Sequence, residues 1–74
     1  METEKKVKDI IANVLGIAPE EINMNADWYY DLGGDSLAHV EAVIEMENEF
    51  DISITDEQSE KLRNVSDFVA IVSK

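Results

Sequence analysis

The residues with the clearest chemical potential are Ser36 and the segment 31–37 around it, Asp-Leu-Gly-Gly-Asp-Ser-Leu. The serine follows two glycines and an aspartate, at the point where a long loop is predicted to become a helix. Its hydroxyl would be exposed at a helix N-terminus, among acidic side chains. Since almost nothing nearby could activate a nucleophile, the pattern indicates an attachment point and not a catalytic serine.

Residues 34–37 also spell the Gly-Asp-Ser-Leu signature of a group of esterases and lipases, so a hydrolase is the rival function. Those enzymes need a general base, which their pattern supplies from a distant Asp-x-x-His. The only histidine here is His39, outside any such pattern. A dyad with Ser36, three residues earlier, is conceivable, but the helical wheel turns His39 toward the core and no oxyanion hole accompanies it. We therefore expect a non-enzyme in which His39 is partly buried or lies at a pocket rim.

Length, charge and composition narrow the function further. The 74 residues suffice for one small domain, residues 1–74, and cysteine is absent, so disulfides and thiolate metal sites are excluded. The net charge is −11, and no lysine or arginine lies between Lys8 and Lys61. Nucleic acid is thus an unsuitable ligand, whereas a protein with a basic patch would be complementary; the alternative is an acidic face that only provides solubility. No apolar run has transmembrane length and no signal peptide opens the sequence, so we expect a cytoplasmic protein.

The acidic loop before Ser36 could be taken for a metal site. Asp27, Asp31 and Asp35 recur every four residues, whereas an EF-hand loop needs alternate ligands and a terminal glutamate. We therefore predict no specific metal site, and only weak divalent binding that relieves charge repulsion.

Hydrophobic periodicity predicts an all-α fold, a small four-helix bundle with three main helices, one short helix and a long loop between the first two helices. The first helix is expected over 3–15, with Thr3 as N-cap and Gly16 as the stop. Residues 16–35 form the loop, and a loop of that length should be functional or tied down. The second helix is expected over 36–50, with Asp35 or Ser36 as its N-cap. A short third helix is expected over 56–62, after a capping box that begins at Thr55. The last helix is expected over 65–73, with Asn64 as its N-cap. The apolar residues expected to anchor the loop are Ile17, Ile22, Trp28 and Leu32.

The second helix carries two apolar stripes, at 100° per residue. One stripe is the predicted core face, with Ala42, Val43, Met46 and Phe50. The other contains Leu37, Val40 and Ile44, beside Glu41 and Asn48. Because a domain this small cannot easily bury a helix on all sides, we expect the second stripe to dock a partner. The triplet 28–30, Trp-Tyr-Tyr, is expected to cover one end of the core rather than to stack bases.

Segment 31–37 strongly resembles the attachment motif of acyl carrier proteins, Asp-Leu-Gly-x-Asp-Ser-Leu. The similarity covers nearly the whole chain, and its further matches lie at 8–11, 15–17, 40–41, 47–51, 54, 56–57 and 65. It implies a carrier whose Ser36 receives 4′-phosphopantetheine from coenzyme A through a separate phosphopantetheinyl transferase and magnesium, with Asp35 and Leu37 flanking the attachment site. The thiol of the arm would carry acyl groups as thioesters in fatty acid or related polyketide or specialised lipid biosynthesis.

The resemblance also implies how enzymes would recognise such a carrier. Acyl-transferring and acyl-modifying enzymes with basic docking patches would bind the apolar patch of Leu37, Val40 and Ile44. The carrier would be a monomer, with acidic groups around this patch. Those acidic groups are Asp35, Glu41 and Glu47. A long acyl chain could fold back between helices, against Ala42, Val43, Met46 and Phe68.

Several residues depart from the family pattern. Gly34 replaces the common alanine, and the resulting Leu-Gly-Gly resembles peptidyl carriers of non-ribosomal synthetases, so an aminoacyl or peptidyl carrier is the alternative. The two glycines are expected to let a transferase approach the backbone. Tyr30, Ala38 and His39 also differ from the usual residues, as do Asn48 and Thr55. These changes bear on partner choice and pocket shape.

Overall fold

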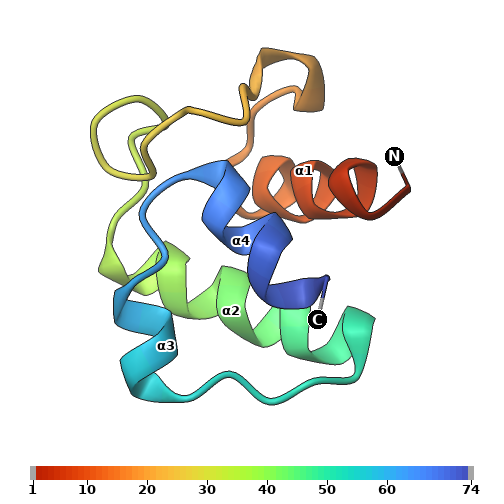
Figure 1. The fold of residues 1–74 in the computed structure, drawn as a ribbon. Coiled ribbons are helices and arrows are strands. Elements are labelled where there is room, and N and C mark those ends of the chain that lie inside the picture. The colour runs from red at the N-terminus through yellow and green to blue at the C-terminus, as the bar shows by residue number, and fades with distance from the viewer. Residues whose placement is uncertain (1, 74) are drawn as a thin grey trace.

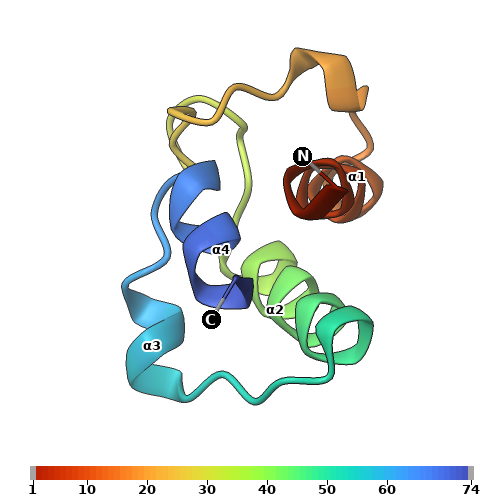
Figure 2. The ribbon, with the colours of Figure 1, turned by 45° about the vertical axis from the view of Figure 1, so that its right-hand side comes forward.

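The structure is a computed structural model that describes residues 2–73. Its elements are α1 (Glu2–Leu15), the 3₁₀ helix η1 (Pro19–Glu21), α2 (Ser36–Phe50), α3 (Asp56–Glu60) and α4 (Val65–Val72). Figure 1 shows the chain order, and Figure 2 shows α1, α2 and α4 around a common centre, with α3 on the side away from α1. Within the described residues, extended pairing is limited to an isolated bridge between Asp27 and Asn64. The all-α bundle of three main helices and one short helix is confirmed.

Most predicted helix ends are correct. The Asp35 side chain accepts a hydrogen bond from Ala38 N and caps α2. Thr55 and Asn64 form capping boxes with Gln58 and Asp67, which satisfy backbone N–H groups at the starts of α3 and α4. Gly16 ends α1 with a φ of 71°, a left-handed conformation that suits glycine.

Three details of the prediction are wrong. Thr3 lies inside α1, which already includes Glu2, because acidic residues at 2 and 4 favour a helix N-terminus. The helix predicted over 56–62 ends at Glu60, and Leu62 instead turns into the core. The loop 16–35 is not wholly irregular, since it contains η1 with Pro19 at its start.

One hydrophobic core lies between α1, α2, α4 and the long loop. Trp28 and Phe68 are its largest fully buried side chains, and the loop also buries Ile22 and Ala26. The predicted core face of α2 is confirmed at Ala42, Val43 and Met46, whereas Phe50 is only partly buried against the cluster. The apolar stripe of α4 is buried as well, at Val65, Phe68, Val69 and Val72.

Backbone hydrogen bonds tie the long loop to the start of α4. Trp28 N donates to Arg63 O at 2.7 Å, Val65 N to Ala26 O at 3.2 Å, and Ser66 N to Met24 O at 2.9 Å. Figure 1 shows the loop passing over the upper end of α4 before it descends to α2. The expectation of a long loop that is tied down is therefore confirmed, and the loop delivers the chain to Ser36 from a fixed position.

The Asn64 cap should be a measurable part of this stability. Its side chain accepts from Asp67 N at 3.0 Å and from the Ser66 hydroxyl at 2.7 Å. We expect Asn64→Ala to lower the free energy of unfolding by about 1 kcal/mol, which for a domain of this size lowers Tm by about 4–8 °C. Thermal unfolding followed by circular dichroism measures the shift. The matched control is Asn13→Ala on the exposed surface of α1, and an equal Tm for both variants would contradict the role of the cap.

Candidate functional site

Ser36 is the first residue of α2, and it is exposed. Asp35 immediately before it has an extended backbone, and its Oδ1 accepts from Ala38 N at 2.8 Å. The first amides of a helix have no partner within the helix, so they and the helix dipole favour an anion near Ser36. The site can therefore hold a phosphodiester on the Ser36 hydroxyl without burying its charge.

The Trp28 indole supports the turn that presents Ser36. Its Nε1 donates to Asp35 O at 3.1 Å, and Gly34 N donates to Trp28 O at 2.9 Å. Gly34 is buried, and a Cβ at this position would overlap the indole ring. The expectation that both glycines leave room for a transferase is thus wrong for Gly34, because the indole fills that space. Gly33 is exposed and has a φ of 71°, so it supplies the left-handed turn.

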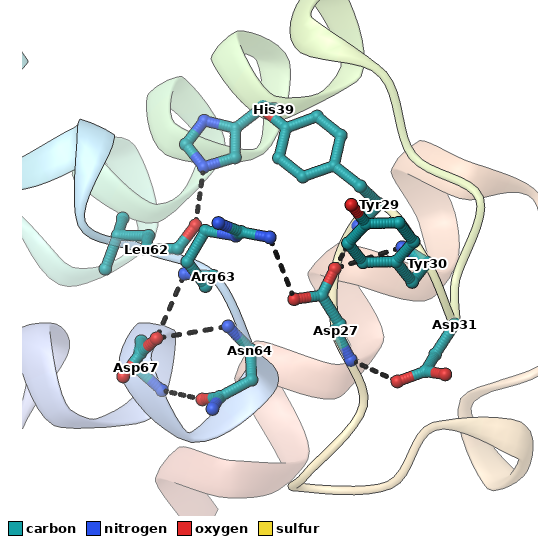
Figure 3. Close-up of polar contacts among 9 residues, drawn as sticks. All are labelled: Asp27, Tyr29, Tyr30, Asp31, His39, Leu62, Arg63, Asn64 and Asp67. Atoms are coloured by element: carbon teal, nitrogen blue, oxygen red, sulfur yellow. Dashed lines mark hydrogen bonds and ion pairs between the residues drawn. The ribbon is translucent and has the colours of Figure 1, made fainter.

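A second set of contacts holds the loop just before this turn. Asp27 Oδ2 accepts from Tyr29 N at 2.9 Å and from Tyr30 N at 3.0 Å, while Asp31 Oδ2 accepts from Asp27 N at 2.7 Å. Arg63 Nη2 lies 3.4 Å from Asp27 Oδ1, and Figure 3 shows the Arg63 side chain directed at this carboxylate. These carboxylates act on the loop backbone, and no cluster of three or more potential metal ligands lies within residues 2–73.

Asp27 is also the residue whose acidity the fold changes. The hydrogen bond from Tyr30 N, followed by that from Tyr29 N and the nearby Arg63 guanidinium, holds the pKa of Asp27 below its ordinary value, although desolvation opposes the shift. The charged carboxylate is therefore the form that the folded loop stabilises.

His39 is buried between the site and the core. Its Nε2 lies 3.1 Å from Leu62 O, and because a carbonyl only accepts, this nitrogen carries the proton. Ring centroids lie 5.5 Å away in both Trp28 and Phe68, and the Tyr29 ring is stacked at 6.4 Å. The prediction of a partly buried or pocket-rim histidine is confirmed, since His39 lines a pocket and its Nε2 is engaged by Leu62 O.

A small pocket opens beside Ser36. Its volume is about 180 Å³, and it lies between the start of α2 and the connection from α3 to α4. The residues around it are Tyr29, Ser36, His39, Val40, Ser59, Glu60, Leu62 and Arg63. Arg63 lies over the Tyr29 ring, with its Cζ 5.7 Å from the ring centroid.

The predicted partner residues of α2 lie mainly on one exposed face. Leu37 is 70% exposed, Val40 52% and Ile44 49%, and Glu41 is also exposed. Glu47 differs, because it is half-buried and its Oε2 accepts from Ile54 N at 2.8 Å. The structure thus gives Glu47 a contact within the chain, while the other four residues are exposed and their spacing places them on one face of α2, the helix that begins at Ser36.

Comparison with known proteins decides the family. The family model described as a phosphopantetheine attachment site matches residues 5–72. An acyl carrier protein of Bdellovibrio bacteriovorus is 46% identical over all 74 residues and 95% of its own length. An acyl carrier protein of Akkermansia muciniphila is 44% identical over 71 residues, 96% of this chain and 89% of the relative. One of Clostridium acetobutylicum is 51% identical over 65 residues, 88% of this chain and 84% of the relative. The chain belongs to the acyl carrier protein family.

Family membership establishes the general role. An acyl carrier protein is a carrier and not a catalyst, it holds 4′-phosphopantetheine covalently, and it works with partner enzymes. The hydrolase alternative is thereby excluded. None of the helices within residues 2–73 has the length and apolar character needed to cross a membrane.

Sequence reasoning missed two contributors to the site. The fit between Trp28 and Gly34 joins residues on either side of a turn, so no helical or strand periodicity reveals it. Arg63 reaches the site from the connection between α3 and α4, and only the tertiary fold brings it to Asp27 and Tyr29.

The packing of Trp28 against Gly34 leads to a stability prediction. We expect Gly34→Ala to cost about 1–3 kcal/mol, because the added methyl group overpacks the indole. The cost should be smaller when Trp28→Phe removes part of the ring, and a double-mutant cycle from thermal or denaturant unfolding measures this coupling. A Gly34→Ala cost that is unchanged by the substitution at Trp28 would show that the two residues act independently.

The lowered pKa of Asp27 predicts a pH dependence with a defined sign. In the acid range, the Asp27 carboxyl binds protons more readily in the unfolded chain than in the folded chain. The charged carboxylate therefore stabilises the fold above the ordinary Asp pKa of about 3.9. This stabilisation is lost as pH falls through the lower pKa of Asp27 in the folded chain. We expect wild type to exceed Asp27→Asn in Tm at neutral pH, with the difference shrinking on acidification. A difference independent of pH would contradict the role of the carboxylate charge.

Proposed function

We propose that Ser36 is the residue that carries the arm, and that residues 1–74 act as one carrier domain. The observation that supports this most is the exposed hydroxyl at the start of α2, within the family motif 31–37 and beside first-turn amides suited to a phosphodiester. Asp35 caps the helix behind Ser36, and Leu37 presents an exposed side chain after it.

The Ser36 hydroxyl would react with the pyrophosphate of coenzyme A in the active site of a phosphopantetheinyl transferase. A bond forms between Ser36 Oγ and phosphorus, the pyrophosphate P–O bond breaks, and the hydroxyl proton passes to the transferase. The nucleotide half of coenzyme A leaves. When attached, the arm supplies a terminal thiol that carries acyl groups as thioesters. This chain contributes an accessible hydroxyl and has no cysteine of its own to capture the acyl group.

We also propose that the exposed face of α2 is where enzymes dock. Leu37, Val40 and Ile44 expose apolar surface beside Ser36, and Glu41 adds a charge that a basic enzyme surface can complement. The acidic stretch from 9 to 60, which contains no lysine or arginine, favours the same kind of partner. The carrier would act as a monomer and, on its sequence, in the cytoplasm.

The acyl cargo of fatty acid synthesis or a related polyketide or lipid pathway is favoured over an aminoacyl or peptidyl cargo. The resemblance to peptidyl carriers rested on Gly34. The buried contact with Trp28 explains that glycine by packing alone, so Leu-Gly-Gly carries no weight for a peptidyl role. The names of the compared relatives agree with an acyl cargo.

Attachment at Ser36 is tested by mass. After incubation with coenzyme A, magnesium and a broad transferase, the intact wild-type chain should gain one phosphopantetheine. Ser36→Ala should gain none, and the matched control Ser59→Ala, which changes another serine at the same pocket, should gain one. A modified Ser36→Ala chain, or an unmodified wild type, would contradict the proposal.

The docking face is tested by kinetics of the same loading reaction. We expect Leu37→Ala to lower kcat/KM by roughly tenfold, the effect of losing about 1.4 kcal/mol at a buried interface position. Circular dichroism should show an unchanged fold, because Leu37 is exposed. The control is Tyr30→Ala, which truncates another exposed apolar side chain outside α2. Equal rates for Leu37→Ala and wild type would place docking elsewhere.

A further inference from the structure

The pocket beside Ser36 and the hydrophobic core are neighbours, and two buried residues, His39 and Leu62, line the pocket. His39 lines the pocket, and on its other side it contacts Trp28 and Phe68, which are 1% and 0% exposed. On the side of the pocket that faces Trp28 and Phe68, an acyl group would therefore meet the imidazole before either of these rings.

His39 is held in this position from three directions. Nε2 donates to Leu62 O, which fastens α2 to the connection between α3 and α4. Trp28 meets the imidazole edge-on, with an interplanar angle of 84°. Tyr29 covers the outer side in a nearly parallel stack, with an interplanar angle of 7°, and Arg63 lies over Tyr29 in turn. Figure 3 shows His39 directed at the Leu62 carbonyl, with Arg63 between this bond and Asp27.

The pocket on the Ser36 side of the His39 imidazole is small, and both apolar and polar residues line it. At about 180 Å³, it lies below the roughly 300–1,000 Å³ of pockets that take drug-sized ligands. Val40 and Leu62 supply apolar surface, while Ser59 and Arg63 supply donors. Such a space suits a short acyl group and its thioester carbonyl, and it is too small for a long alkyl chain.

We propose that His39 is a specificity-determining residue that closes the pocket beside Ser36 at its inner end, so that this carrier accommodates a short acyl group there and keeps a long chain out of its core. This inference rests on the proposed attachment of the arm to Ser36. It replaces the expectation that a long chain folds back against Ala42, Val43, Met46 and Phe68, since the imidazole blocks that route. Long cargo would remain outside the helices, accessible to partner enzymes and to water.

The test compares butanoyl and dodecanoyl forms of the carrier, made by loading each acyl-coenzyme A with a broad transferase. Intact mass is measured first. A chain that accepts no acyl arm overturns both the proposed attachment at Ser36 and the proposed role of His39. A loaded chain then tests the role of His39 alone. Side-chain NMR then locates the acyl group. We expect butanoyl to shift Tyr29 and Val40 signals, and dodecanoyl to leave Met46 and Phe68 signals and Tm unchanged. Shifts at Met46 and Phe68 in dodecanoyl wild type, or none at Tyr29 and Val40 with butanoyl, would overturn the proposal.

Variants at His39 provide the converse experiment. His39→Ala removes the ring, and His39→Gln removes the ring while retaining an N–H donor for Leu62 O. We expect dodecanoyl loading of a folded His39 variant to shift Met46 and Phe68 and to raise its Tm, whereas Tyr30→Ala should behave as wild type. A folded variant that keeps the wild-type response to dodecanoyl would overturn the proposal. Should both variants fail to fold, the wild-type comparison of the two acyl forms decides it alone.

Discussion

The contact between the Trp28 indole and the backbone at Gly34 and Asp35 is the constraint on which the site depends. The loop before α2 is long, and a serine at the end of a loose loop would have no defined position. A buried indole that fills the space of a missing Cβ and donates to Asp35 O fixes where the loop ends and α2 begins. The same ring packs against Phe68, so the presentation of Ser36 is coupled to the core. Ser36 is thus both exposed and held in a defined position.

Charge has two separate uses in this chain. Asp27 and Asp31 accept hydrogen bonds from backbone N–H groups of the loop, and these bonds order the loop. Glu41 and much of the remaining acidic surface stay exposed, where they can attract a basic enzyme from a distance. The basic Arg63 belongs to the first group, since it pairs with Asp27 and covers Tyr29. A carrier needs both properties, because it must hold its shape while many enzymes bind it in turn.

The sequence predicts the helices and the buried stripes well, and it predicts the shape of the site poorly. Local signals explain the success, since Gly16, Asp35, Thr55 and Asn64 act through neighbours a few residues away. The errors concern competition between local and tertiary forces. Leu62 fits the end of a helix but is drawn into the core, and Gly34 suggests open space but accommodates an indole. The position of His39 against Leu62 O and the reach of Arg63 to Asp27 join segments more than twenty residues apart, which no periodicity records.

A carrier needs one defined attachment point, and we propose that it is the Ser36 hydroxyl at the start of α2. Fragmentation mass spectrometry of the modified wild-type chain tests it most directly, because Ser36 must be distinguished from Ser53, Ser59 and the other hydroxyl residues. We expect fragment ions that place the whole added mass on Ser36. Added mass on any other residue, or divided among several serines, would contradict it.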